Sequence, residues 1–187
     1  NVKSHDVNFK NINKSDVYIM SNRVTCMFYL NDYNNYLVFS SYDDKNSTLY
    51  MKKNDEDKKE IFSLQNENVL HIDAYDIQGL LYVIAYTGKN IYLYKSNKVD
   101  LFLIDIPNCT TIQLKYNTTL SIIAVTPSIV YMMDEGLNII NRKLLIYNSV
   151  HGFCRSFTEQ PLIASWFNDQ VGITDVTTGF MKSVANL

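Results

Sequence analysis

The stretch Leu80-Leu-Tyr-Val-Ile-Ala85, Thr87-Gly-Lys89, Asn90-Ile-Tyr-Leu-Tyr94 decides the fold class. Two runs of β-branched, aromatic and aliphatic residues lie on either side of a short turn that contains glycine and ends at asparagine. Such side chains suit a pleated surface, and glycine and asparagine tolerate the backbone angles of a tight turn. The stretch therefore predicts two antiparallel strands joined by a hairpin.

The same pattern extends in both directions from this hairpin. Val69-Leu-His-Ile-Asp-Ala74 precedes it, and Val99-Asp-Leu-Phe-Leu-Ile104 follows it. Together the four runs form one unit of four strands joined by short turns. Helical periodicity is nearly absent from the rest of the chain as well. The predicted fold class is therefore all-β, built from four-stranded antiparallel units.

This unit recurs four times along the chain. The second strands of the four units begin at Tyr36, Leu80, Leu120 and Pro161, at intervals of 44, 40 and 41 residues. Intervals of about 40 to 45 residues are typical of the blades of a β-propeller. Each second strand also ends in a small residue, as expected where strands crowd toward a central axis. These small residues are Ser41, Ala85, Ala124 and Ser165. Sandwiches and trefoils also use short antiparallel strands and remain alternatives.

The repeat divides the chain into predicted domains. The four predicted blades are residues 24–64, 69–106, 110–148 and 150–187. Residues 1–23 form an N-terminal segment whose apolar stretch, Val17-Tyr-Ile-Met20, is a candidate outer strand of a preceding blade. Propellers join about four to eight blades in a ring that removes exposed edges. Four blades can close a ring alone, which is one alternative. The other, which we favour, is that this chain is half of a larger ring completed by further chain or by a partner.

Three turns resemble those of WD40 repeats. Val171-Gly-Ile-Thr-Asp-Val-Thr-Thr-Gly179 resembles the third strand and following turn of a WD40 blade, with Thr174-Asp175 in place of the aromatic-Asp pair. Gly88-Lys89-Asn90 and Asn168-Asp169-Gln170 resemble the turn between the second and third strands. No Gly-His pair opens a unit, and no Trp-Asp pair closes one. The resemblance covers about residues 24–187 and implies a divergent WD40-like β-propeller that acts as a protein-interaction scaffold.

Charge and composition argue against several classes of partner. The chain has 17 basic and 19 acidic residues and a formal net charge of -2, so no global field attracts nucleic acid or an anionic membrane. No apolar run reaches the roughly 18 residues of a membrane span. Cys26, Cys109 and Cys154 are odd in number and far apart, which favours a reducing compartment. We therefore predict no nucleic-acid partner, no transmembrane segment, and a location in the cytoplasm or nucleus.

The sequence predicts no catalytic residues, no metal site and no cofactor. The three histidines, His5, His71 and His151, belong to different parts of the chain and have no acidic residue at a metal-ligand spacing. A propeller enzyme would need charged side chains that converge from the first strands of several blades. Asp73, Lys115 and Arg155 occupy such positions, but their charges have mixed signs.

Aromatic residues at strand ends are the predicted partner-binding residues. Tyr86, Trp166 and Phe167 lie at boundaries between strands and turns, where one face of a propeller would present them. Exposed aromatic side chains are typical interface hot spots. We predict a non-catalytic protein–protein interaction scaffold within a multi-subunit complex, without a small-molecule cofactor. The alternatives are a propeller enzyme such as a hydrolase, and a propeller that binds lipids or glycans.

Overall fold

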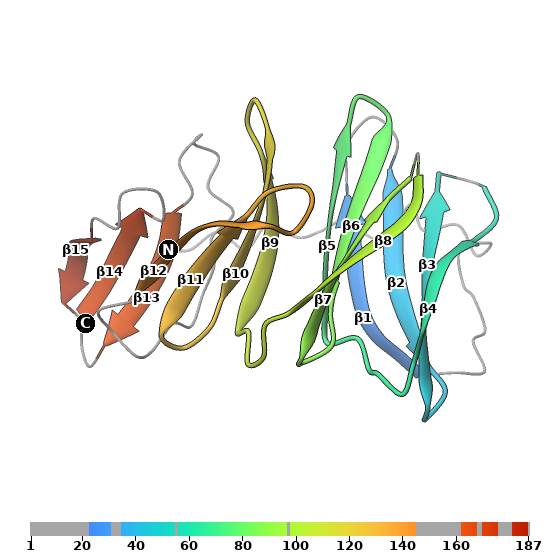
Figure 1. Ribbon diagram of the computed structural model, residues 1–187, viewed down its shortest axis with the longest axis horizontal. Helices are drawn as coiled ribbons and strands as arrows, with labels where there is room; N and C mark the ends of the chain where they lie inside the picture. The colour runs from blue at the N-terminus through green and yellow to red at the C-terminus, as the bar shows by residue number, and fades with distance from the viewer. Residues whose placement is uncertain are drawn as a thin grey trace, which may run out of the picture.

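The part of the chain that the structure describes forms four antiparallel β-sheets. The computed structural model describes residues 23–30, 35–54, 56–96, 98–144, 162–167, 170–175 and 181–186. The regular secondary structure in these ranges consists of β-strands and includes no helix. Strands that follow one another in the chain pair with one another in the sheet. We name the sheets sheet 1 to sheet 4 in chain order. Figure 1 shows them side by side, from sheet 1 on the right to sheet 4 on the left. The prediction of an all-β fold made of four-stranded antiparallel units is confirmed.

The first two sheets have four strands each. Sheet 1 contains β1 (Arg23–Leu30), β2 (Tyr36–Tyr42), β3 (Asn46–Lys53) and β4 (Lys59–Gln65). Sheet 2 contains β5 (His71–Ile77), β6 (Leu80–Tyr86), β7 (Asn90–Lys95) and β8 (Lys98–Asp105). The hairpin that decided the fold class is β6 and β7, and Tyr86 pairs with Ile91 beside its turn.

The last two sheets complete the described chain. Sheet 3 contains β9 (Thr111–Tyr116), β10 (Leu120–Val125), β11 (Ile129–Met133) and β12 (Ile139–Leu144). Sheet 4 contains β13 (Leu162–Phe167), β14 (Gln170–Asp175) and β15 (Met181–Asn186). The predicted N-terminal segment, residues 1–23, lies almost wholly outside the described residues. The first part of the predicted fourth blade, residues 150–161, also lies outside them.

Side-chain contacts lie at the start of two strands. β5 begins at His71 rather than Val69, because the N–H of Val69 donates a hydrogen bond to the hydroxyl of Ser47 in sheet 1 at 3.1 Å. β12 begins at Ile139, directly after the turn in which the carboxylate of Asp134 accepts hydrogen bonds from the following backbone. Both contacts are made by polar side chains outside the strand, which the alternation of apolar and polar residues does not predict.

Two hydrophobic cores hold the first three sheets together. Almost every side chain of β6 is buried, because successive side chains point to opposite faces of sheet 2 and each face packs in a different core. Ile84 packs between sheets 2 and 3, whereas Val83 packs between sheets 1 and 2, and neither has any solvent-exposed surface. Burying one such side chain contributes roughly 1.5 to 3 kcal/mol. The small residues expected on the second strands, Ser41, Ala85 and Ala124, are also buried.

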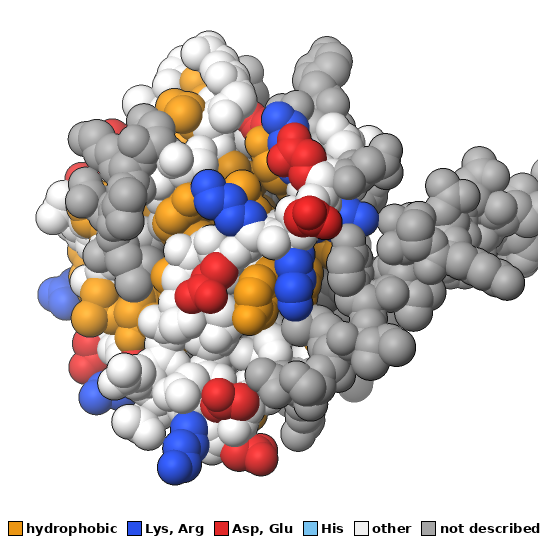
Figure 2. Space-filling view, turned by 90° about the vertical axis from the view of Figure 1, so that its right-hand side faces the viewer, with side chains coloured by type: hydrophobic (Ala, Val, Ile, Leu, Met, Phe, Trp, Pro, Cys, Tyr) orange, Lys and Arg blue, Asp and Glu red, His pale blue; other side chains and the backbone are white. Residues whose placement is uncertain are grey.

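The first strands of sheets 1, 2 and 3 lie next to one another. β5 packs against β1 on one side and against β9 on the other. Figure 2 shows the face at the sheet 1 end of the molecule, where basic and acidic side chains are interspersed among apolar ones. No single-signed field covers the described part of that face, as the near-neutral composition predicts.

Candidate functional site

Tyrosines from two sheets meet at one end of the interface between sheets 2 and 3. Tyr75 on β5 lies directly opposite Tyr82 on β6. On β9, Tyr116 lies opposite Leu120 of β10. The rings of Tyr75 and Tyr116 are 6.1 Å apart between centroids and inclined at 46°, a favourable tilted arrangement. The strand registers therefore bring aromatic side chains of both sheets to the same end.

A groove opens at this aromatic contact. Its volume is about 410 Å³, within the range of small-ligand and peptide pockets. Ile77 and Tyr82 line it from sheet 2, and Tyr116, Leu120 and Ile140 line it from sheet 3. We call this feature the sheet 2–3 groove. Its apolar lining is partly open to solvent, since the side chains of Tyr116 and Ile140 are 37% and 58% exposed.

Two acidic residues form one rim of the groove. Asp134 and Glu135 stand at the turn between β11 and β12. The carboxylate of Asp134 accepts hydrogen bonds from the N–H groups of Gly136, at 2.8 Å, and Asn138, at 2.9 Å. Hydrogen bonds from Asn138, through its side chain and its backbone, lower the pKa of Asp134 below its ordinary value. Asp134 is therefore ionised at neutral pH, and its turn has a fixed shape.

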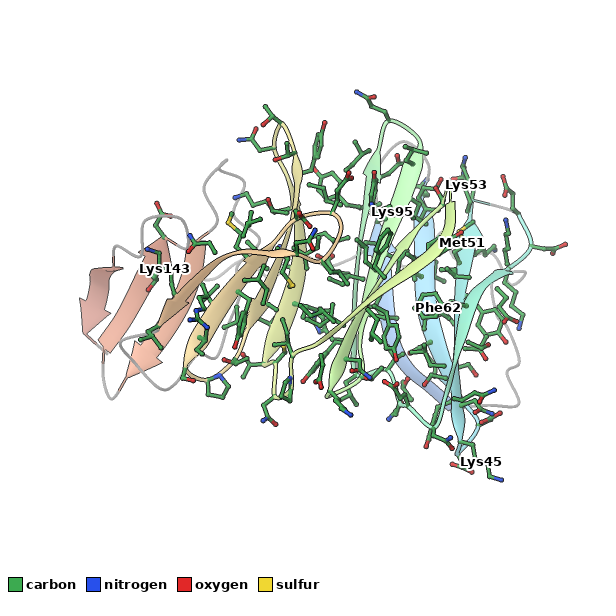
Figure 3. All side chains as sticks on the ribbon, in the orientation of Figure 1. Lys45, Met51, Lys53, Phe62, Lys95 and Lys143 are labelled. Carbon is green, nitrogen blue, oxygen red and sulfur yellow. The ribbon has the colours of Figure 1, made fainter. Side chains whose placement is uncertain are left out.

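A lysine of sheet 2 reaches this acidic rim. Lys95 Nζ lies 3.7 Å from a carboxylate oxygen of Glu135 and 4.6 Å from the centroid of the Phe102 ring. Figure 3 labels Lys95 at the end of β7, in the upper half of the view, where Lys53 of sheet 1 is also labelled. The contact with the Phe102 ring holds the ammonium group by a cation–π interaction. Lys95 therefore has two partners, one apolar and one acidic.

Tyr82 forms part of the inner wall of the groove. Its side chain is 9% exposed. Burial, and secondarily the charge of Glu135 and the neighbouring Tyr116, raise the pKa of Tyr82 above its ordinary value. The phenol therefore stays neutral at physiological pH and keeps its proton as a hydrogen-bond donor. The groove thus offers apolar walls, a neutral hydroxyl and an acidic rim.

A second polar cluster lies where the connection from β4 to β5 meets the turn between β6 and β7. The carboxylate of Glu67 accepts hydrogen bonds from the hydroxyl groups of Tyr92, at 2.6 Å, and Thr87, and from the amide of Asn90, at 3.1 Å. These bonds join the connection that follows sheet 1 to the β6–β7 hairpin of sheet 2. All three donors are used within the cluster, so its visible role is structural.

The charged positions that a propeller enzyme would use do not assemble a catalytic set in the described residues. Asp73 is 4% exposed and accepts hydrogen bonds from the N–H groups of Ala74 and Leu114. Lys115 is half-buried, and Arg155 lies outside the described residues. No group of three His, Cys, Asp or Glu side chains in the described ranges could hold a metal ion.

The predicted partner-binding residues have different outcomes. Tyr86 is 4% exposed, and its hydroxyl accepts a hydrogen bond from the N–H of Cys109 at 2.7 Å. Its side chain points toward sheet 3, where the connection that includes Ile106 and Cys109 covers it. The expected exposure of Tyr86 is therefore corrected. Trp166 and Phe167 end β13, but their side chains lie outside the described part of the structure, so contact through them stays a prediction.

The sequence interpretation did not find the groove. Tyr116 ends β9 immediately before the turn of residues 117–119, so the rule that selected Tyr86 would have selected it as well. The other walls carry no such signal, because their proximity depends on the packing of two sheets. His71 is half-buried, and burial lowers the pKa of its imidazole.

Comparison with known proteins identifies the fold. No family model matches the chain, and no curated protein matches it either. Solved structures do match. Hsv2 of Kluyveromyces marxianus is 16% identical with a TM-score of 0.56, and the match covers 89% of this chain and 50% of that one. The fold is that of a β-propeller. The four sheets correspond to propeller blades.

Two further propeller structures are similar. BBS1N, solved in complex with ARL6, has a TM-score of 0.65 at 6% identity, and the match covers 90% of this chain and 57% of that one. The dihydro-heme d1 dehydrogenase NirN has a TM-score of 0.61 at 14% identity, with coverage of 90% and 38%. This chain spans about half the length of the matched proteins, or less. At these identities the similarity shows the fold alone.

The described residues contain no helix with the length and hydropathy needed to cross a membrane.

Proposed function

We propose that this chain is a non-catalytic protein-interaction part of a divergent WD40-like propeller, and that it binds another protein through the sheet 2–3 groove. The observation that carries this proposal is the exposed apolar surface of Tyr116 and Ile140 beside an acidic rim. Aromatic and apolar anchors in a pocket with a polar rim are the usual composition of a binding hot spot.

Two further observations support binding rather than catalysis. The buried carboxylate of Asp73 and the half-buried carboxylate of Glu67 both accept hydrogen bonds that join parts of the fold. Among the similar structures, BBS1N was solved in complex with another protein, ARL6. NirN bears the name of an enzyme, so the fold also occurs in catalysis. We propose a multi-subunit assembly in the cytoplasm or nucleus as the setting.

The test compares two exposed aliphatic side chains in the natural full-length protein. Ile140 in the groove is 58% exposed, and Leu103 on β8 outside the groove lining is 57% exposed, so truncation of either removes a similar apolar surface. Affinity purification with mass spectrometry should recover a stoichiometric partner with the wild type and with Leu103→Ser. Ile140→Ser should weaken the complex about tenfold, the size expected at an interface hot spot.

Three results would contradict the proposal. A partner retained equally by both variants would place the interface elsewhere. A monodisperse monomer without a partner would remove the evidence for a scaffold. Binding to lipid vesicles or to a glycan array by the wild type, in the absence of a protein partner, would favour the ligand-binding alternative. The thermal midpoints of both variants should match, which separates loss of binding from loss of fold.

A further inference from the structure

The shape of the sheet 2–3 groove favours a short extended segment as its occupant. A volume of about 410 Å³ accommodates a few side chains, whereas an interface between two folded domains usually involves about 20 to 30 residues on each side. The exposed parts of Tyr116 and Ile140 give such a segment an apolar contact. The threonine-containing turn of residues 117–119 lies at the edge of the groove and adds polar atoms there.

The charge at the rim favours a basic side chain in that segment. Asp134 and Glu135 are adjacent on the turn, and both line the groove. The side chain of Glu135 is 60% exposed, so a ligand can reach it. A phosphate or another anion would meet two carboxylates at this rim and be repelled. An arginine or lysine would be attracted, and arginine could form paired hydrogen bonds with Glu135.

Lys95 of the protein itself already occupies this basic position. Its ammonium group lies 3.7 Å from Glu135, longer than a charge-assisted hydrogen bond, and the Glu135 side of the pair is exposed to solvent, so the direct contact is weak. The cation–π contact with Phe102 gives Lys95 a second partner if Glu135 turns toward a ligand. The side chain of Lys95 is 12% exposed, so its charge needs a partner when Glu135 turns away. The ring of Phe102 and the nearby charge of Asp134, whose pKa Lys95 helps to lower, supply that partner, and a ligand cation can then take the place of Lys95 at Glu135.

We propose that the sheet 2–3 groove binds a peptide segment with a basic side chain close to an apolar one, and that Lys95 holds Glu135 in the free protein until the basic side chain of the peptide replaces it. This inference rests on the proposed function, because it names the class of partner for the same groove.

The test uses the full chain and a library of random eight-residue peptides. Peptides selected by the wild type should combine Arg or Lys with Leu, Ile, Phe or Tyr. Glu135→Gln should weaken a selected peptide about threefold to fivefold, the range of an exposed ion pair. Lys95→Met keeps the apolar stem on Phe102 but removes the competing charge, so it should strengthen the same peptide by a similar factor.

Matched controls exist on sheet 1. Lys53, at the same end of the molecule in Figure 3, lies 5.7 Å from the ring of Tyr36, so Lys53→Met also removes a lysine from an aromatic ring. Glu56 is an exposed glutamate in the connection from β3 to β4, so Glu56→Gln removes a carboxylate outside the groove. Neither control should change the dissociation constant.

The outcomes separate this inference from the proposed function. Selected peptides that are acidic or neutral, peptides unaffected by Glu135→Gln, or weaker binding by Lys95→Met would each overturn the inference. Failure to select any peptide would overturn it as well. In all these cases the proposed function still depends only on whether Ile140→Ser loses the natural partner. If Ile140→Ser loses the partner but the selected peptides are acidic, the groove is still the interface and its ligand has the opposite charge to the one proposed.

Discussion

The carboxylate of Asp73 on β5 accepts a hydrogen bond from the backbone N–H of Leu114 on β9 at 2.7 Å, and so joins sheet 2 to sheet 3. Both strands are at the edges of their sheets, where one row of backbone amides has no strand partner. The other oxygen of the same carboxylate accepts from the N–H of Ala74 at 2.9 Å. One buried side chain therefore satisfies amides of two sheets.

We expect Asp73→Ala to lower the free energy of unfolding by about 3 kcal/mol, because it leaves buried backbone N–H groups without their acceptor. Urea unfolding of the full chain, followed by circular dichroism, measures the loss. Asp57→Ala is the matched control, since Asp57 is exposed and its replacement should cost less than about 0.5 kcal/mol. Equal losses in both variants would show that Asp73 does not join the sheets energetically.

Glu67 should give the fold a dependence on acidic pH. Burial raises the pKa of Glu67, but hydrogen bonds from Thr87, Tyr92 and Asn90 outweigh this effect, and the pKa lies below the ordinary value of 4.5. A carboxyl group with a lowered pKa stabilises the fold above pH 4.5, and this stabilisation is lost as the pH falls through the lowered pKa.

The test of this dependence is the difference in unfolding free energy between the wild type and Glu67→Gln. The difference should be largest at neutral pH and should shrink steadily below pH 4.5 as the wild-type carboxylate is protonated. Glu56→Gln, at an exposed position, should follow the wild type throughout. A difference between wild type and Glu67→Gln that stays constant down to pH 3 would show that the hydrogen bonds do not favour the carboxylate.

Cys109 should react slowly with thiol reagents in the folded protein. Burial raises the pKa of its thiol from 9.0 to about 11, and the hydrogen bond with Tyr86 offsets only part of this effect. Because the thiolate is the reactive form, labelling near pH 8 should be about 100-fold slower than for an ordinary thiol.

This rate can be measured in a chain that keeps Cys109 and carries Cys26→Ser and Cys154→Ser. Labelling should become fast in urea, when the connection that covers Tyr86 unfolds. Tyr86→Phe removes the hydrogen bond that lowers the pKa of this thiol, so it should slow labelling of the folded protein further. Rapid labelling of the native chain would mean that this connection opens easily, and that Tyr86 is accessible after all.

The sequence predicted the strands well because short-range rules govern them. The run Leu80–Ala85 was expected, and β6 spans Leu80–Tyr86, since alternation and the glycine turn are both local. Tyr86 was misjudged for the opposite reason. Its burial depends on a connection that ends 23 residues later in the chain, at Cys109. A residue at a strand end is exposed only if no distant segment covers it.

The groove lay beyond sequence reasoning for the same physical reason. Tyr82, Tyr116 and Glu135 belong to different hairpins, and their proximity follows from how sheet 2 packs on sheet 3. Asp73 was recognised as a first-strand position, but its acceptor role needed the position of the β9 backbone. Periodicity predicts which face of a strand is buried, and it does not predict which side chains of two sheets meet.

Replacing Gly79 and Gly88 would measure how much the backbone conformation of two turns contributes to the free energy of unfolding. Gly79 and Gly88 both have positive φ, 84° and 92°, a conformation that side chains disfavour. A Cβ at Gly79 would meet nothing within 4 Å, whereas one at Gly88 would lie 3.2 Å from a terminal methyl group of Leu70. Leu70 is 56% exposed, so its side chain can move away at little cost.

We therefore expect Gly79→Ala and Gly88→Ala to lower the free energy of unfolding by similar amounts, about 1 to 2 kcal/mol each, since the backbone conformation sets the cost in both turns. Asparagine tolerates positive φ better than alanine, so Gly79→Asn and Gly88→Asn should recover part of each loss. Urea unfolding of the four variants measures these differences. A much larger loss for Gly88→Ala than for Gly79→Ala, with no recovery by asparagine, would show instead that Leu70 is fixed in place against the turn.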